Sequence, residues 1–144
     1  IEASWLIHEA ALVVGDLDLL KKVEPVIVKI AEAADEGLNP DGSMIYENFV
    51  SKGKIDRELH WWVQAENVVG HVNLFQHFGD EEALHIALRC WNFIQTKLVD
   101  KVHGEWHWSL YADGTINIKD DKAGFWKCPY HNGRMCMEIL ERFA

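Results

Sequence analysis

The stretch FQHFGDEEALHI, residues 75–86, contains the Gly-Asp pair at Gly79–Asp80 that decides the fold. A glycine suits the left-handed position that ends a helix, and an aspartate suits the cap of the helix that follows. Apolar residues recur at helical spacing on both sides of this pair. The pattern predicts helices over Glu58–Phe78 and from Glu81 to about Val99, joined as a helical hairpin.

The same signal occurs earlier in the chain, at Gly15–Asp16. It separates a predicted helix over residues 3–14 from a second one that runs from Leu17 to about Glu36. Pro25 lies inside the second helix and either kinks it or marks its first turn. Two helical hairpins make a weak internal repeat, and such repeats bury their apolar faces by stacking on neighbours.

The connections between helices carry their own signals. MIYENF, residues 44–49, predicts a short strand, and GEWHWSLYADGTINI, residues 104–118, alternates with a hairpin turn at Asp113–Gly114. A last helix is predicted from about Asn132 to Phe143. The fold class is therefore all-α, with helical hairpins and short β-hairpin loops in one domain over residues 1–144. An unpaired last helix indicates part of a ring or solenoid.

Composition excludes several function classes. The 144 residues include 23 acidic and 14 basic side chains, for a formal net charge of −9, which argues against nucleic acid and against an anionic membrane surface. No apolar run approaches the roughly 20 residues that span a bilayer. Three cysteines without a CxxC pair favour a reducing cytoplasm, and their spacing fits no common zinc site. Seven tryptophans suit a core or the walls of a sugar site.

The segment HWWVQAE, residues 60–66, places two tryptophans side by side. Neighbours on a helix point about 100° apart, so Trp61 and Trp62 cannot both enter one core. Either one is buried and the other packs against a loop, or one faces a cavity and stacks on a ligand. Trp62 and Glu66 share a helix face, which would put a carboxylate near that ligand.

The segment WKCPYHNGR, residues 126–134, concentrates polar groups at the start of the last predicted helix. The positive end of a helix dipole favours the neutral form of His131, and a neutral imidazole can act as a general base. The alternative is that His131 or Asn132 only caps the helix. Glu2 lies in the first turn of its predicted helix, where a glutamate commonly does no more than stabilise the positive end of the helix dipole.

Three stretches together resemble a known family: EASWLIHEAA (2–11), HWWVQAENVVG (60–70) and GFWKCPYHNGRMCMEI (124–139). They are similar to the C-terminal part of the cellobiose 2-epimerases, within the N-acylglucosamine 2-epimerase superfamily. The resemblance covers the whole chain but only the last third of a member. It implies the C-terminal portion of an (α/α)6 barrel. It also implies C2 epimerisation of a reducing-end aldose through a cis-enediolate, without metal or redox cofactor.

The resemblance assigns roles residue by residue. His131 matches one acid/base histidine, and the other matches a position three residues before Glu2, upstream of Ile1. Glu2 resembles the carboxylate that supports that second histidine, and Glu66 resembles the carboxylate that orients His131. The matches to sugar-contacting positions are Trp61 and Trp62 around the sugar, Trp126 on the second sugar unit, and Arg134 reaching the cleft.

Three expectations follow from how much of the family pattern is present. The chain starts at Ile1 without methionine, inside a helical pattern, which favours part of a longer chain. These residues alone are expected not to epimerise a small-molecule sugar. They are also expected to expose apolar helix faces, through which a homodimer could form.

Other functions remain open from the sequence. An N-acylglucosamine 2-epimerase or an aldose–ketose isomerase would share the two-histidine chemistry. A non-catalytic carbohydrate-binding helical module would use the tryptophans without turnover. A glycoside hydrolase needs two carboxylates about 5–10 Å apart. Glu2 and Glu66 could supply them, but the histidine motif would then have no explanation.

Overall fold

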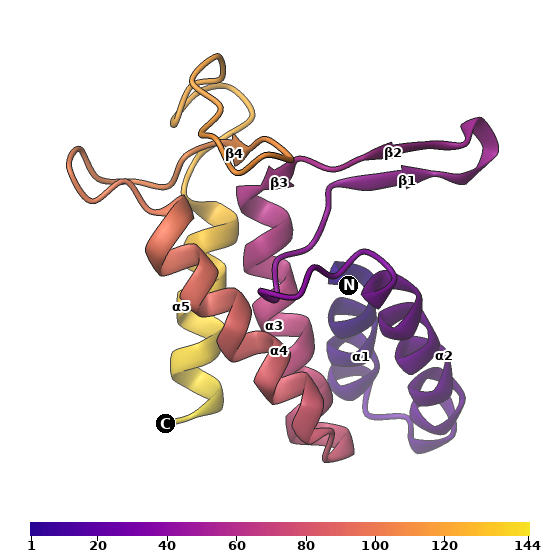
Figure 1. Ribbon diagram of the computed structural model, residues 1–144. Helices are drawn as coiled ribbons and strands as arrows, with labels where there is room; N and C mark the ends of the chain where they lie inside the picture. Colours follow the sequence, from indigo (N-terminus) through magenta and orange to yellow (C-terminus); the bar gives the residue numbers. More distant parts are fainter.

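The computed structural model describes residues 1–144, and helices make up most of it (Figure 1). The body consists of five α-helices: α1 (Glu2–Val14), α2 (Leu17–Asp35), α3 (Trp61–Phe78), α4 (Glu81–Phe93) and α5 (Tyr130–Arg142). Two short antiparallel strand pairs lie in the connections: β1 (Glu47–Phe49) with β2 (Lys54–Asp56), and β3 (Leu59–His60) with β4 (Ser109–Leu110). The predicted all-α class is confirmed.

The two Gly-Asp pairs form the turns of two helical hairpins, as the sequence predicts. Gly15 and Gly79 both adopt the left-handed conformation, with φ of 71° and 70°. Asp16 accepts hydrogen bonds from two backbone amides of α2, and Asp80 accepts one from α4. The local chemistry of each pair therefore ends one helix and starts the next. Pro25 lies inside α2, which continues through it as one helix.

Helix α3 is the central element, because α1, α4 and α5 all pack against it. Thirteen of its residues are buried, which is every residue from Trp61 to Leu74 except Trp62. The largest core cluster joins α3 to α4, to α5 and to Trp5 of α1. No helix combines the length and the apolar character that crossing a lipid bilayer requires.

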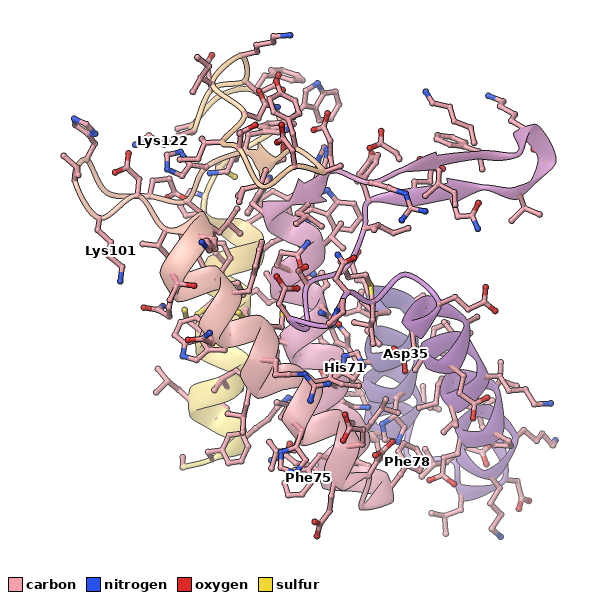
Figure 2. All side chains as sticks on the ribbon, in the orientation of Figure 1. Asp35, His71, Phe75, Phe78, Lys101 and Lys122 are labelled. Carbon is pink, nitrogen blue, oxygen red and sulfur yellow. The ribbon has the colours of Figure 1, made fainter.

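Buried polar side chains of α3 hold its neighbours in place. Gln64 donates to and accepts from the backbone of Met44, at 2.8 and 2.9 Å. His71, fully buried, lies 3.1 Å from Asp35 at the end of α2, and the two side chains face each other in Figure 2. Satisfied polar groups of this kind fix the register of packed helices, because leaving one unpaired in the core costs free energy.

The two largest boundary differences from the sequence prediction are at the start of α3 and the end of α4. The helix predicted from Glu58 begins at Trp61, because Leu59 and His60 pair with Leu110 and Ser109 as strands β3 and β4. The helix predicted to reach Val99 is α4 followed by a π-helical turn, η2 (Ile94–Leu98). Backbone pairing with a distant segment decided the first boundary, and helical periodicity carries no information about such pairing.

The predicted strand regions are shorter than their alternating patterns. Residues 44–49 contribute β1, which pairs with β2 in an arm that projects from the helices and turns at the 3-10 turn η1 (Val50–Lys52). Residues 104–118 contribute only β4 and isolated bridges. The turn at Asp113–Gly114 is present, with a φ of 82° at the glycine. These loops cover the end of the molecule at which α3 and α5 begin.

Candidate active site

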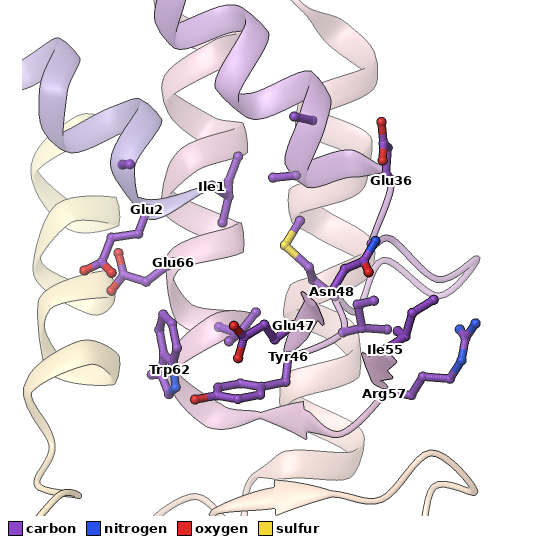
Figure 3. Close-up of a pocket in the computed structure, with 17 residues that line it drawn as sticks. Ile1, Glu2, Glu36, Tyr46, Glu47, Asn48, Ile55, Arg57, Trp62 and Glu66 are labelled. Atoms are coloured by element: carbon purple, nitrogen blue, oxygen red, sulfur yellow. The ribbon is translucent and has the colours of Figure 1, made fainter. Parts of the chain in front are cut away.

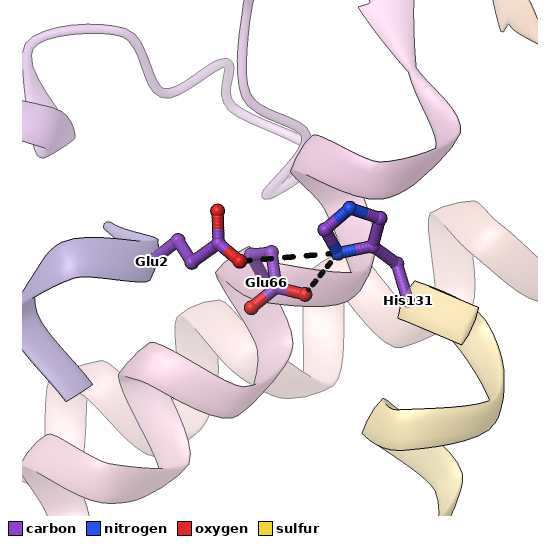
Figure 4. A group of neighbouring side chains, drawn as sticks. All are labelled: Glu2, Glu66 and His131. Atoms are coloured by element: carbon purple, nitrogen blue, oxygen red, sulfur yellow. Dashed lines mark hydrogen bonds and ion pairs between the residues drawn. The ribbon is translucent and has the colours of Figure 1, made fainter. Parts of the chain in front are cut away.

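The first turns of α1 and α5 and the second turn of α3 bring three titratable side chains together: Glu2, His131 and Glu66 (Figure 4). Gly70 lets α1 approach α3 closely, since a Cβ there would lie 2.5 Å from Cγ1 of Ile1. Glu66 lies one turn before Gly70 on the same face of α3, so it meets Glu2 at the start of α1. Residues more than 60 positions apart therefore share one site.

Glu66 is the centre of the hydrogen-bond network, with an exposed fraction of only 1%. Its Oε2 accepts from the indole of Trp5 at 3.0 Å. Its Oε1 accepts from Nδ1 of His131 at 2.6 Å and from Nη2 of Arg134 at 2.7 Å. Burial raises the pKa of Glu66, but hydrogen bonds from His131 and Arg134 outweigh it, so the pKa lies below its ordinary value. The carboxylate is therefore ionised at neutral pH.

The short contact to Glu66 fixes which nitrogen of His131 carries the proton. A carboxylate only accepts, so Nδ1 must be the donor, and a neutral ring then has its lone pair on Nε2. Nε2 makes no hydrogen bond within the chain and is not sealed in the interior. The rings of Trp61, Trp62 and Tyr130 surround the imidazole, with centroids 5.3, 5.5 and 4.0 Å away. Nε2 is thus the atom that could exchange a proton with a ligand.

Arg134 supplies the positive charge of the site. Its Nη2 donates to Oε1 of Glu2 at 2.6 Å and to Oε1 of Glu66 at 2.7 Å, and its guanidinium lies 5.1 Å from the ring of Trp5. Burial lowers the pKa of Arg134, but the carboxylates of Glu66 and Glu2 raise it by more. The pKa of Arg134 therefore lies above its ordinary value. Nη2 also lies 3.3 Å from Nδ1 of His131. Both atoms carry hydrogens, so this is a contact rather than a hydrogen bond.

The atoms of Glu2, Glu66 and His131 that could bind a metal ion lie within 4.8 Å of one another. The chemistry of the group does not fit a metal. The guanidinium of Arg134 already bridges the two carboxylates. Nδ1 of His131 carries a hydrogen and has no lone pair to offer. The arrangement is an internal ion pair with an oriented imidazole.

A cleft of about 410 Å³ lies beside this network (Figure 3). Glu2, Glu66 and Trp62 form one wall, and residues of the β1–β2 region, including Tyr46 and Arg57, form another. Tyr46 stacks on His60 at 4.0 Å and meets Trp62 edge-on at 6.1 Å between ring centroids. His131 is not itself on the cleft wall, but its ring packs against Trp62. An aromatic and acidic cleft of this kind suits a small polar ligand.

The two tryptophans take different places, and the structure decides the alternative that the sequence left open. Trp62 faces the cleft, whereas Trp61 is 1% exposed and packs edge-on against Tyr130 and His131. Burial gives Trp61 no open face for a sugar to stack on. Trp126 is 76% exposed in the loop before α5, where its ring packs edge-on against Phe125, and it makes no hydrogen bond or ring contact with Glu2, Glu66 or His131.

Helix capping does not account for His131 or Asn132. The cap of α5 is Pro129, and no side chain hydrogen-bonds to the open amides there. The amide of Asn132 instead donates to Oε1 of Glu105 at 3.0 Å. Sequence reasoning missed two partners of the site, Trp5 and Tyr46. Trp5 lies one turn after Glu2, which was a usable signal, but Tyr46 comes from a loop that only the fold brings near.

Comparison with known proteins places these observations in a family. Residues 1–133 match the family described as N-acylglucosamine 2-epimerase (GlcNAc 2-epimerase). A cellobiose 2-epimerase from Bacteroides fragilis is 64% identical over 140 residues, which are 97% of this chain and 36% of that protein. One from Ruminococcus albus is 43% identical over 143 residues, which are 99% of this chain and 36% of that protein.

A solved structure agrees with these sequence matches. The structure of cellobiose 2-epimerase from Bacillus thermoamylovorans superposes with a TM-score of 0.89 at 43% identity, over 98% of this chain and 36% of that one. The chain thus spans about a third of the length of the relatives it matches. Its five helices are part of an (α/α)6 barrel. By sequence and by structure, the chain belongs to the N-acylglucosamine 2-epimerase family.

Proposed function

We propose that the protein carrying this chain epimerises C2 of the reducing-end aldose of a disaccharide, with His131 as one of two acid/base groups. The observation that carries the proposal is the oriented imidazole: Nδ1 is fixed by ionised Glu66, Nε2 makes no hydrogen bond, and the ring packs against Trp62 of the aromatic cleft. Family membership and relatives named cellobiose 2-epimerase support the choice of reaction and substrate.

The reaction needs proton transfer and no net oxidation. With the sugar ring open, a base takes the C2 proton and the electron pair of that bond forms a cis-enediolate with the aldehyde. The C2–C3 bond then rotates, and an acid returns a proton to the opposite face of C2. Imidazoles suit both steps because their ordinary pKa of about 6.5 lies near neutral pH. No redox cofactor enters this proton balance.

His131 and Glu66 divide the work on one face of the sugar. Nε2 of His131 exchanges the proton with C2, and the carboxylate 2.6 Å from Nδ1 stabilises the imidazolium that forms. The second acid/base group is proposed to be the histidine that the resemblance places three residues before Glu2. Glu2 already lies 4.0 Å from Nδ1 of His131, so a group beside it would reach the same substrate carbon from another side.

The tryptophans are proposed to hold the sugar. The C–H face of a pyranose packs on an aromatic ring, and Trp62 offers such a face to the cleft. Trp126, with 76% of its surface exposed, is proposed to stack on the second sugar unit. Trp61 is assigned a supporting role behind His131, and Arg134 is assigned to holding both carboxylates.

The remaining two thirds of the barrel are proposed to be necessary for turnover. A groove of about 360 Å³ between α3, α4 and α5 is lined by hydrophobic residues alone, including Trp91 and Phe143. Further helices of the same barrel would cover such a surface, and homodimerisation through it stays a prediction. Cys128 and Cys136 are exposed free thiols, which suits the proposed cytoplasmic location.

Incubation of the full-length protein with cellobiose, followed by NMR of the anomeric protons, tests the proposal. Glucosyl-mannose should appear, and the 144 residues by themselves should produce none. A matched incubation with N-acetylglucosamine separates the family alternatives. Cellobiose binding without turnover would favour a non-catalytic module, and release of free glucose would favour a hydrolase.

A further inference from the structure

The segment Ala123–Tyr130 leads into α5 and carries Trp126, yet almost nothing anchors it to the body. Seven of its eight residues are exposed, and the exception is Lys127, which is 1% exposed. A fully buried lysine is rare, because an ammonium loses its hydration unless every donor is satisfied. A charged side chain is therefore the only buried attachment of the segment that precedes His131.

All three donors of Lys127 are used. Nζ donates to the backbone carbonyls of Lys122 and Trp106, at 2.6 and 2.8 Å, and to Oε1 of Glu105 at 3.2 Å. It also lies 4.9 Å from the ring centroid of Trp61, within the range of a cation–π contact. Burial lowers the pKa of Lys127, and Glu105 opposes that shift by stabilising the charged form.

Glu105 connects this ammonium to α5. The same Oε1 accepts from Nδ2 of Asn132 at 3.0 Å and from the backbone amide of Trp106 at 3.0 Å. The backbone of Glu105 has a φ of 64°, the only positive φ outside glycine in the chain. A non-glycine residue in this conformation is strained and persists where its surroundings over-determine it. Here the surroundings are three hydrogen bonds to a single carboxylate oxygen.

Two routes lead from this ion pair to the proposed acid/base group. Asn132 is the neighbour of His131 in the first turn of α5, and its side chain is tied to Glu105. The ring of Trp61 contacts both groups: its centroid lies 4.9 Å from Nζ of Lys127 and 5.3 Å from the centroid of the His131 ring. Neither Lys127 nor Glu105 lines the cleft of about 410 Å³, so neither is placed to touch the substrate.

We propose that the buried Lys127–Glu105 pair is a positioning element that sets the ring of His131 for proton transfer, through Asn132 and Trp61. The proposal rests on the proposed epimerase function. It differs from a purely structural role in one consequence: loss of the pair lowers kcat in protein that remains folded. Glu66 orients the imidazole of His131 from α3, whereas the Lys127–Glu105 pair orients it from the loops.

The test compares two lysines of the same loop in the full-length protein. Lys127→Met keeps the length of the side chain and removes its charge. Lys122→Met is the control, because the ammonium of Lys122, labelled in Figure 2, binds Asp100 and the Gly104 carbonyl at 2.6 and 3.0 Å and makes no hydrogen bond to Glu105 or Asn132. Epimerisation of cellobiose and exchange of its C2 proton with D2O are measured for each. We expect kcat to fall about 10–100-fold for Lys127→Met and less than 3-fold for Lys122→Met.

A second variant covers the case in which Lys127→Met does not fold. Asn132→Ala removes the hydrogen bond to Glu105, together with one that the side chain accepts from the amide of Gly133, and leaves the ion pair intact. We expect its kcat to fall about 10-fold. Where both variants fold, the double variant should lose less than the product of the single effects, because both act on one ring. An unchanged kcat in Asn132→Ala, or equal effects in the two lysine variants, would overturn the proposal. If the unmodified protein has no epimerase activity, it is the proposed function that fails.

Discussion

Helices α1, α3 and α5 are tied together twice, two helical turns apart, by the same kinds of residue. Each layer takes a glutamate from α1, a polar residue from α3 and an arginine from α5, together with one histidine. We call them the first layer (Glu2, Glu66, His131, Arg134) and the second layer (His8, Glu9, Asn73, Arg142). The comparison shows what separates a reactive site from a structural one within a single packing arrangement.

The second layer is built like the first. Arg142 forms an ion pair with Glu9 and another with Glu138, and it donates to Oδ1 of Asn73 at 3.3 Å. The amide of Asn73 lies 3.2 Å from Nδ1 of His8. His8 and Asn73 are each 1% exposed. Apart from the Arg142–Glu138 pair, which lies within α5, each of these contacts joins two helices, so the layer contributes to holding the three helices together.

The layers differ in charge and in access. The residue from α3 is the ionised Glu66 in the first layer and the neutral Asn73 in the second. The ring of His131 packs against Trp62 of the cleft, and His131 is 7% exposed, whereas His8 is 1% exposed and does not line that cleft. His8 is covered by His77 and by Phe78, with ring centroids 4.6 and 5.4 Å away. A charged partner and an open nitrogen make the first layer suited to proton transfer.

The largest expected effect separates the two histidines. In the full-length protein, His131→Asn should lower kcat for cellobiose about 10³-fold, since it removes a general acid/base group. His8→Asn should change kcat less than 3-fold, because His8 is covered by neighbouring side chains. Rates of glucosyl-mannose formation measured by NMR check both. Equal losses in the two variants would mean that the layers do not differ in function.

The next comparison substitutes, one at a time, the residues that α3 contributes to the two layers, Glu66 and Asn73. Glu66→Gln keeps the shape of the side chain but loses the charge that fixes and stabilises His131, so kcat should fall roughly 10²-fold. Asn73→Ala should leave kcat within about 2-fold and lower the free energy of unfolding by about 1–3 kcal/mol, because buried partners lose a hydrogen bond. Steady-state kinetics and urea unfolding of both variants measure this. An unchanged kcat in Glu66→Gln would mean that the charge of Glu66 does not separate the function of the first layer from that of the second.

A smaller effect concerns the ring that faces the cleft. Trp62→Ala should raise KM for cellobiose about 3–10-fold, with a lesser change in kcat, because a stacking surface for the sugar is lost. Trp91→Ala is the matched control, since Trp91 lies on α4 in the apolar groove away from the cleft. Its KM should stay unchanged. If Trp91→Ala raises KM as much as Trp62→Ala does, the cleft is not the sugar site.

The smallest expected effects are in the pH dependence of stability. As pH rises, the contribution of Glu66 in the first layer should increase and that of Glu9 in the second layer should decrease. The pKa of Glu66 lies below its ordinary 4.5, so its contribution is present above pH 4.5 and is lost as pH falls through the folded pKa. Burial, Glu138 and other neighbours raise the pKa of Glu9, so its contribution is present below pH 4.5 and is lost as pH rises through the folded pKa.

Urea unfolding between pH 3 and pH 7 measures these contributions. Glu66→Gln should flatten the acid side of the stability curve, and Glu9→Gln should flatten the side above pH 4.5. The unmodified protein provides the reference curve. A curve that keeps its acid slope in Glu66→Gln would place that titration elsewhere in the molecule.

The helical hairpins could be predicted because their signals are local. Gly79 and Asp80 end one helix and cap the next through their own backbone and side-chain chemistry, whatever surrounds them. The start of α3 could not be predicted, because Leu59 and His60 pair with residues some 50 positions later. The Lys127–Glu105 pair was missed for the same reason, since it joins two loops that are far apart in sequence.

The sequence by itself determined the helix class, the resemblance to the family and four residues that the structure brings together: Glu2, Glu66, His131 and Arg134. Only the tertiary structure decided which of two adjacent tryptophans faces the cleft and which histidine packs against that tryptophan. Helical spacing fixes the angle between Trp61 and Trp62 but not the direction of either. Direction and access come from the packing of α1 and α5 around α3, which opens the first layer and covers His8 in the second.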